Sequence, residues 1–209
     1  MTSGDAQHLS GLIGRIYETV DAPDQWHSIL GEIAGAVRAK SGLLRMLDLR
    51  GDRAVRSSYH HNLDDDLQSA YCAGLVNDDP YLDALCRVAP GRMVTNDRLI
   101  DLDALRRTSF YQHYLGPLDN HYVCGGFVQR DTAGRFTILG LHRHRGATQF
   151  DDRELQLVQL LSPHVRRAVQ LGNLLARESR RADTAEAALD DLSVAAYLLD
   201  GDDRVLHAN

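Results

Sequence analysis

Residues 150–181 carry a helical pattern that is longer than a small domain is wide, and this length limits the possible architectures. Its apolar residues recur at helical spacing, and residues 151–181 would span roughly 45 Å at a rise of about 1.5 Å per residue. Asp151 and Asp152 stand at its beginning, where negative charge stabilises a helix. We therefore expect the first part of this helix to pack on a domain and the second part to project from it.

A hairpin pattern follows the long helix within residues 187–209. A helix end leads into an apolar strand, the turn Gly201-Asp202-Asp203 and a second strand. An isolated two-stranded hairpin is only marginally stable in water. We therefore expect residues 187–209 to be the first strands of a second domain, of which this chain holds only the beginning.

Two pairs of predicted strands indicate an antiparallel sheet. Residues 43–49 and 54–60 are predicted as strands on either side of a Gly51-Asp52 turn. Residues 122–130 and 135–143 give a clearer signal, with the loop Asp131-Thr132-Ala133-Gly134 between them. Since hairpins pair neighbouring strands, both pairs are expected to join one sheet.

Helical patterns lie before, between and after these hairpins. Residues 9–20 and 26–37 each carry an apolar face, and residues 63–118 contain further helical segments, one of them predicted over 102–115. This order predicts an α+β fold, with helices on both faces of an antiparallel sheet and a long C-terminal helix. We expect the first, second and last helices on one face, and residues 63–118 on the other face, where they close a pocket.

The composition narrows the class of protein. A formal net charge of −6 and a pI near 5.9 argue against a nucleic-acid contact surface, which is normally basic. The N-terminal residues lack a signal-peptide pattern, and no apolar run approaches the roughly 20 residues of a spanning helix. Cys72, Cys86 and Cys124 have no metal-ligand spacing and suggest no disulfide framework. We expect a soluble, cytoplasmic protein without membrane contact.

Aromatic residues of the segment over the predicted pocket are the best functional lead, because tyrosine offers both an apolar ring and a polar group to a ligand. Arg45 lies within a predicted strand and Asp79 precedes a proline, so each has the chemistry to pair with a polar group of a ligand or with the other. The alternative is that these rings only pack the second layer. The candidate ligand-binding residues are Arg45, Tyr59, Tyr71, Asp79, Tyr81, Phe110, Tyr111, Tyr114 and Cys124.

Catalytic and metal-binding interpretations have less support. Cys124, beside Gly125-Gly126, has three readings: a nucleophile, a residue of the pocket floor, or a small buried hydrophobic residue. His142 and His144 are two apart on a strand end and form a possible ligand pair, with a solvated strand end as the alternative. No phosphate-binding glycine loop is present. We expect neither an enzyme, nor a bound metal, nor a cofactor.

The second part of the long helix carries a roughly seven-residue apolar seam among its arginines. Such a seam is typical of a two-stranded coil, and a projecting helix commonly finds its partner in a symmetric dimer. The alternative is a solvated basic face. The residues predicted at a dimer interface are Val165, Ala168, Val169, Gly172 and Leu175.

Several motifs resemble the N-terminal half of bacterial LuxR-type helix-turn-helix transcriptional regulators. The residues that carry the resemblance are 12–17, Asp24-Gln25-Trp26, Tyr71 with Asp79-Pro80-Tyr81, 91–94, 109–117 and 150–168. Residues 195–209 resemble the opening strands of a PAS domain. The resemblance departs at the tryptophan with which autoinducer-binding relatives hold a lactone ring, because the only tryptophan here is Trp26 in an early helix.

The resemblance implies a sensory module that dimerises and binds an unknown small molecule. The resemblance divides the chain into three parts. They are a GAF-like domain over residues 1–165, a linker and dimerisation helix over 166–186, and the start of a PAS-like domain over 187–209. DNA binding is implied only through a C-terminal domain outside this chain. Two alternatives remain open: a ligand-free dimerisation scaffold, and a small hydrolytic enzyme.

Overall fold

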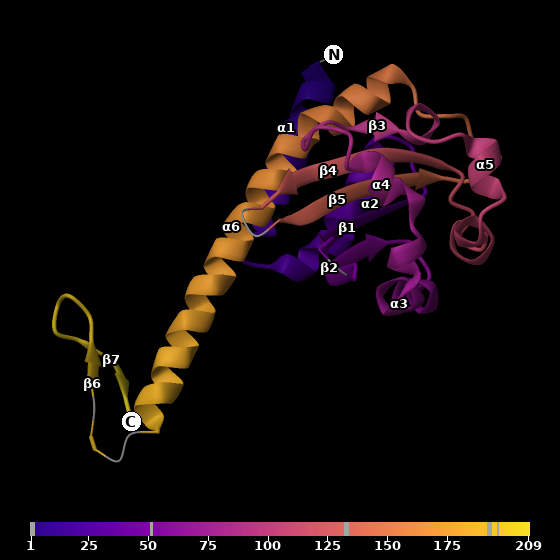
Figure 1. The fold of residues 1–209 in the computed structure, drawn as a ribbon. Helices are drawn as coiled ribbons and strands as arrows, with labels where there is room; N and C mark the ends of the chain where they lie inside the picture. Colours follow the sequence, from indigo (N-terminus) through magenta and orange to yellow (C-terminus); the bar gives the residue numbers. More distant parts are fainter. Residues whose placement is uncertain (1–2, 51, 132–133, 192–193, 196) are drawn as a thin grey trace.

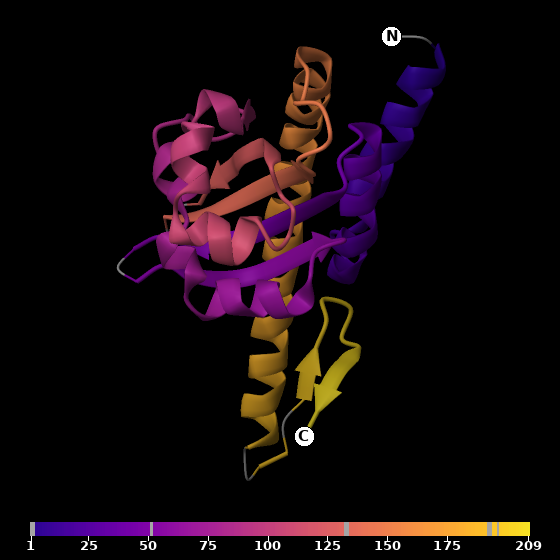
Figure 2. The same cartoon turned by 90° about the vertical axis from the view of Figure 1, so that its right-hand side faces the viewer.

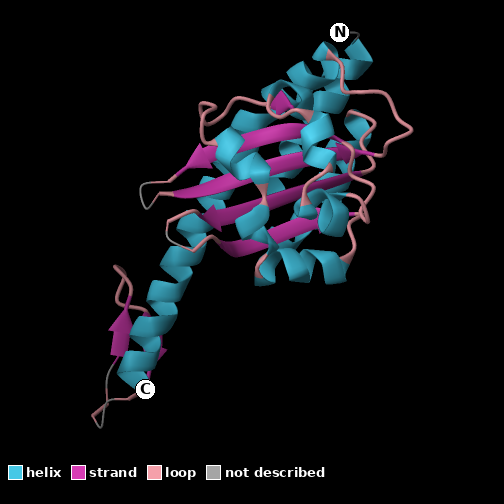
Figure 3. Cartoon of the chain, turned by 45° about the vertical axis from the view of Figure 1, so that its right-hand side comes forward, coloured by secondary structure: helices cyan, strands magenta, loops and turns pink. Residues whose placement is uncertain are grey.

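The computed structural model describes residues 3–50, 52–131, 134–191, 194–195 and 197–209. Its centre is a five-stranded antiparallel sheet with the order β2-β1-β5-β4-β3 (Figure 3). The expected antiparallel sheet is confirmed. The strands are β1 (Ser41–Asp48), β2 (Ala54–His61), β3 (Val94–Thr95), β4 (Tyr122–Arg130) and β5 (Arg135–Arg143). The turn predicted at Gly51 and the loop residues Thr132 and Ala133 lie outside the described residues.

One face of the sheet is covered by the helices nearest the two ends of the chain. They are α1 (Ser3–Glu18), the short 3-10 turn η1 (Pro23–Gln25), α2 (Trp26–Ala36) and α6 (Asp152–Asp190). The apolar faces of α1, α2 and α6 enclose a core with the inward residues Leu139 and Leu141 of β5 and Cys124 of β4. This confirms the arrangement expected for the first, second and last helices.

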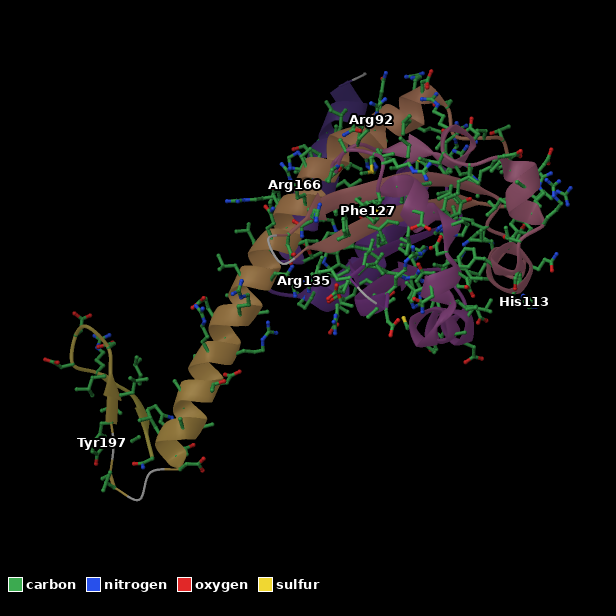
Figure 4. All side chains as sticks on the ribbon, viewed as in Figure 1. Arg92, His113, Phe127, Arg135, Arg166 and Tyr197 are labelled. Carbon is green, nitrogen blue, oxygen red and sulfur yellow. The ribbon has the colours of Figure 1, made fainter. Side chains whose placement is uncertain are left out.

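The opposite face is covered by the chain between β2 and β4, which lies on the other side of the sheet in Figure 2. A second apolar core, separate from the first, forms there around Leu47, Phe127 and the rings of this segment. Phe127 is labelled in the interior of the domain in Figure 4. The helical elements of the segment are α3 (Asp65–Ala73), η2 (Leu75–Asp78), α4 (Pro80–Leu85), η3 (Asn96–Arg98), α5 (Leu102–Arg106) and the π-helical turn η4 (Tyr111–Leu115).

The single helix predicted over residues 102–115 is wrong, because the structure divides it between α5 and η4. The cause lies at Thr108. Its hydroxyl donates to the carbonyl of Leu105 and accepts from the amide of Tyr111, at 2.7 and 3.1 Å. A threonine hydroxyl that binds nearby backbone groups competes with the helical pattern. The break lets the second piece turn its rings toward the sheet.

Helix α6 is longer than the sequence pattern indicated, since it continues to Asp190 instead of ending near Arg181. Its 39 residues correspond to about 58 Å, and its second half projects beyond the sheet (Figure 1). The strands β6 (Tyr197–Leu199) and β7 (Val205–Ala208) form the expected hairpin beside its end. Tyr197 marks this hairpin in Figure 4. Leu192, Ser193 and Ala196 lie outside the described residues.

Among the described residues, no helix combines the length and the apolar character needed to cross a membrane.

Candidate functional site

A cavity lies between the sheet and the segment over residues 63–118. Its volume is about 60 Å³, several-fold smaller than the usual small-molecule pocket. Most of its wall is apolar, formed by Leu43, Leu85, Val94, Leu99, Phe110, Leu115, Val123 and Ile138. The polar side chains in the wall are Arg45, Tyr71, Asp79, Tyr81, Asn96, Tyr114 and His142. An apolar wall with a few polar groups is the arrangement that binds small molecules.

Arg45 connects the sheet to the covering segment. It leaves β1 on the cavity side and is 3% exposed. Its guanidinium donates to Ser58 Oγ at 3.1 Å, to Tyr114 Oη at 2.8 Å and to Gln68 Oε1. It also lies 3.9 Å from the centre of the Tyr71 ring. One cationic side chain on the sheet therefore holds both α3 and η4.

Asp79 is the second polar centre of the cavity. It precedes the first residue of α4, where a carboxylate caps free amides, and its Oδ1 accepts from Tyr81 N at 2.9 Å. Its Oδ2 accepts from Tyr71 Oη at 2.7 Å. Burial raises the pKa of this carboxyl, and the hydrogen bonds from Tyr71 and from the Tyr81 amide act in the opposite direction.

Arg45 and Asp79 do not form an ion pair among the described contacts. They are joined through Tyr71, whose ring receives the guanidinium and whose hydroxyl donates to Asp79. The direct pairing of Arg45 with Asp79, one of the two expected alternatives, is therefore absent from the described contacts, and both residues line the same cavity with an aromatic ring between them.

Asn96 and His142 are polar wall residues that the pocket prediction missed. Asn96 donates to the hydroxyl of Tyr81 at 3.2 Å and to the carbonyl of His121 at 2.9 Å. His142 Nδ1 lies 3.2 Å from Ser41 Oγ, and burial lowers the pKa of the ring to about 3. The alternation of side chains along β5 could have indicated His142, because Ile138, Gly140 and His142 lie on the same face of this strand. No local signal marks Asn96, which belongs to a 3-10 turn.

Six of the nine predicted ligand-binding residues line the cavity: Arg45, Tyr71, Asp79, Tyr81, Phe110 and Tyr114. The other three do not. Tyr59 packs on the opposite face of the sheet, with its ring against His27 of α2. Tyr111 packs in the second core and places its hydroxyl 3.3 Å from His121 Nδ1.

Cys124 also differs from the expectation that it forms the pocket floor. Side chains alternate along a strand, so Val123 faces the cavity while Cys124 lies in the core beneath α6. The floor at this point is the backbone of Gly125 and Gly126. A Cβ at Gly126 would lie 2.5 Å from the carbonyl oxygen of Arg92, so this glycine accommodates the protein's own backbone.

The same burial argues against nucleophilic chemistry at Cys124. Burial raises the pKa of its thiol to about 12, which keeps the thiol protonated, whereas the thiolate is the reactive form. His142 lies on the other face of the sheet. Within the described part of the chain, no cluster of three or more His, Cys, Asp or Glu side chains has the geometry to hold a metal ion.

Two sets of contacts join the cavity wall to α6. Next to His142, Arg143 faces the other side of the sheet and donates to Glu154 Oε1 of α6 at 2.5 Å. Glu154 also completes a capping box with Asp151 at the start of α6. At the β3 edge, Gln159 of α6 accepts from the amide of Met93 at 2.9 Å and donates to the carbonyl of Gly91 at 2.7 Å.

The predicted dimer-interface residues occupy three environments on α6. Val165 and Ala168 are buried in the protomer's own core. Val169 packs partly against that core, and a Cβ at Gly172 would meet the carbonyl of Val20 at 3.3 Å. Leu175 is 49% exposed, as is the neighbouring Leu174 at 55%. The freely exposed part of the seam therefore begins near Leu175.

Comparison of the fold places it among ligand-binding and GAF domains. The ligand-binding domain of VqsR from Pseudomonas aeruginosa is similar with a TM-score of 0.60 and 17% identity, over 82% of this chain and 97% of that one. The N-acylhomoserine lactone dependent LuxR family factor CepR2 from Burkholderia cenocepacia is similar with a TM-score of 0.56 and 15% identity, over 81% and 99%. The phycoerythrobilin-bound GAF domain of a cyanobacterial phytochrome reaches 0.54 at 14% identity, over 84% and 100%.

At these identities the similarity establishes the fold, which is the GAF-like α+β fold shared by LuxR-type ligand-binding domains. No protein-family model and no curated protein matches the sequence. The fold expected from the resemblance is confirmed, and the named neighbours are sensory or ligand-binding domains.

Proposed function

We propose that this chain is the sensory region of a LuxR-type transcription regulator, which binds a small molecule in the cavity and dimerises through α6. The observation that carries the proposal is the mostly apolar cavity with several polar side chains in its wall. In the complete regulator, which acts in the cytoplasm, DNA is bound by a C-terminal domain outside this chain. Residues 1–165 form the sensor in this proposal, 166–186 the linker helix and 187–209 the start of a PAS-like domain.

The ligand signal passes from the cavity to α6 through the two sets of contacts described above. β3 supplies Val94 to the cavity wall, and the adjacent Met93 binds Gln159 of α6. β5 supplies His142 to the wall, and the adjacent Arg143 binds Glu154. A ligand shifts an equilibrium only if it binds one arrangement better than another. A small displacement of β3 or β5 is the change that would reposition α6.

Dimerisation would use the exposed half of α6. Beyond Gly172 the helix leaves the sheet, and its side chains are largely exposed up to Asp190. Leu175, Ala182 and Leu189 recur there at spacings that keep them on one side of the helix. A two-fold partner helix would bury this stripe, so that a change at the start of α6 reaches the partner.

The relatives support a small-molecule function, but the cavity indicates a smaller ligand than theirs. CepR2 is described as dependent on N-acylhomoserine lactone, and the cyanobacterial GAF domain binds phycoerythrobilin. A volume of about 60 Å³ accommodates about four to six water-sized groups, at 10–15 Å³ for each. We therefore propose a compact metabolite as the ligand of this chain.

Thermal unfolding in the presence of a library of small metabolites tests the proposal. We expect at least one compound to raise the Tm of the 209-residue chain in a saturable manner, because a ligand bound only by the folded state stabilises it. The matched variant is Gly140→Ala, whose Cβ would lie 3.3 Å from Leu43 and 3.4 Å from His142 Nε2 in the cavity wall. Gly140→Ala should lose most of the ligand-induced rise in Tm.

The control is Gly11→Ala in α1, where an added Cβ meets no atom within 4 Å. This variant should respond as the wild type does. If no compound shifts the wild-type Tm, or if Gly140→Ala responds fully, the cavity is not a ligand site and the ligand-free scaffold becomes the better description.

A further inference from the structure

The two deeply buried arginines of the domain have different partners. Arg143, on the α6 side of the sheet, is paired with the carboxylate of Glu154 at 2.5 Å. Arg45, on the cavity side, has no carboxylate within 4.0 Å among the described residues, and its acceptors are the uncharged Ser58, Gln68 and Tyr114. A buried charge is stable when it is paired and hydrogen-bonded. The fold supplies the anion for one guanidinium and leaves the other without one.

The cavity wall also holds hydrogen-bond donors that have no acceptor among the described residues. Arg45 Nε and Nη2 are engaged, whereas Nη1 has no hydrogen-bond partner among the described residues. The Tyr81 hydroxyl accepts from Asn96, and its own proton has no described acceptor. Asp79 is the one carboxylate in the described lining, and each of its oxygens already accepts a hydrogen bond. A ligand with acceptor oxygens would complete this set.

We propose that the cavity binds a small monocarboxylate, with the carboxylate on Arg45 Nη1 and a short carbon chain against the apolar wall. This inference rests on the proposed ligand-binding function and adds the chemical class of the ligand. The carboxylate supplies the missing negative charge, and a hydrogen bond with an ionised donor or acceptor is about twice as strong as one between neutral groups. Four to six non-hydrogen atoms correspond to acids of about two to four carbons.

Binding of such an acid would also act on the covering segment. Arg45 holds Gln68 of α3 and Tyr114 of η4, so a carboxylate on the same guanidinium changes the balance of these contacts. The covering segment and the ligand would then both bind the guanidinium of Arg45.

Nuclear magnetic resonance titration of the ¹⁵N-labelled 209-residue chain tests the inference. The probes are sodium acetate, propionate and butyrate, each compared with its primary amide, with sodium chloride added to equal ionic strength. Each amide keeps the shape of its acid and loses the charge. We expect saturable shifts with at least one acid, including a shift of the Arg45 side-chain resonance of the protein. The dissociation constant for this acid should be at least tenfold lower than that for the matching amide.

Two variants locate the binding. Arg45→Met should abolish the preference for acid over amide. Arg166→Met removes an arginine that projects from α6 on the outside of the domain (Figure 4), and should leave the preference unchanged. The comparison of acid with amide in the wild type needs no variant, so the inference stays testable if Arg45→Met does not fold.

Each contrary result has a distinct meaning. Amides that bind as well as their acids would overturn the carboxylate class and leave a neutral-ligand sensor. A preference that survives Arg45→Met would overturn the placement on Arg45. Absence of binding for both series would overturn the inference, and the thermal-shift library then decides separately whether the cavity binds any ligand.

Discussion

At the scale of single residues, neighbours on β5 serve opposite faces of the sheet. His142 lies in the cavity wall and Arg143 in the contact with α6. This follows from the alternation of side chains along a strand. Two adjacent residues therefore connect the candidate site to the long helix without any intervening element.

His142 makes the stability of the protein depend on pH. Burial, with the nearby charges of Arg45 and Lys40, lowers the pKa of His142 from 6.5 to about 3. Because the unfolded state then binds more protons between pH 6.5 and 3, stability falls as the pH falls through this window. We expect the free energy of unfolding to be about 2 kcal/mol smaller at pH 5 than at pH 7 from this residue. Urea unfolding at a series of pH values measures it.

His142→Asn should flatten this pH dependence, whatever its effect on stability at pH 7. His8→Asn, at an exposed position of α1, should keep the wild-type slope. An unchanged slope in His142→Asn would show that other groups cause the loss of stability in acid.

At the scale of elements, the beginning of α6 is fixed more firmly than its end. Glu154 receives hydrogen bonds from Arg143, Arg38 and the amide of Asp151. Burial acts to raise the pKa of Glu154, but these hydrogen bonds outweigh it and lower the pKa below its usual value. Its stabilising contribution is therefore present above the unfolded pKa and is lost as the pH falls through the folded one.

Glu154→Gln should destabilise the domain strongly, because it leaves the buried guanidinium of Arg143 without its carboxylate. Removing one partner of a buried ion pair costs about 3–5 kcal/mol, and equilibrium urea unfolding measures the loss. Glu178→Gln is the matched control on the same helix. Its ion pair with Arg181 is exposed, and such pairs contribute roughly 0–1 kcal/mol. Equal effects of the two variants would contradict the role of Glu154.

At the scale of the whole molecule, α6 joins a domain with two cores to a hairpin that lies far from it (Figure 1). The hairpin packs near the helix end, where His207 lies 2.8 Å from Asp190 and Asn209 donates to the carbonyl of Leu189. Its apolar residues Tyr197, Val205 and Leu206 remain 59–67% exposed. These exposed apolar residues, like Leu174 and Leu175 on α6, mark this end of the molecule as the region to test for association.

Leu175→Glu should convert a dimer into a monomer, because it places a charge in the proposed apolar seam. Size-exclusion chromatography with light scattering gives the mass, and we expect the dissociation constant of the dimer to rise at least tenfold. Leu160→Glu is the control, since Leu160 on α6 is exposed to a similar extent and lies outside the seam. If Leu160→Glu dissociates the dimer and Leu175→Glu does not, the interface lies on the domain.

Much of the fold could be predicted from the sequence, whereas the candidate site was predicted in part. The strands 122–130 and 135–143 were predicted at their observed bounds, because alternation and turn composition are local signals. Tyr71, Tyr81 and Tyr114 were predicted in the cavity because residues 63–118 cover one face of the sheet. Tyr59 and Cys124 were misplaced, since a shift of one residue along a strand moves a side chain to the other face.

The sequence by itself determined the order of elements, the antiparallel sheet and the existence of a projecting helix, because apolar periodicity, turn residues and caps act over a few residues. Only the tertiary structure decided that Arg45 of β1 meets Gln68 of α3 and Tyr114 of η4. It alone decided that Glu154, and not a cavity residue, neutralises Arg143. These contacts join residues 11 to 69 positions apart, and they depend on strand register and on how the covering segment lies on the sheet, which no local pattern records.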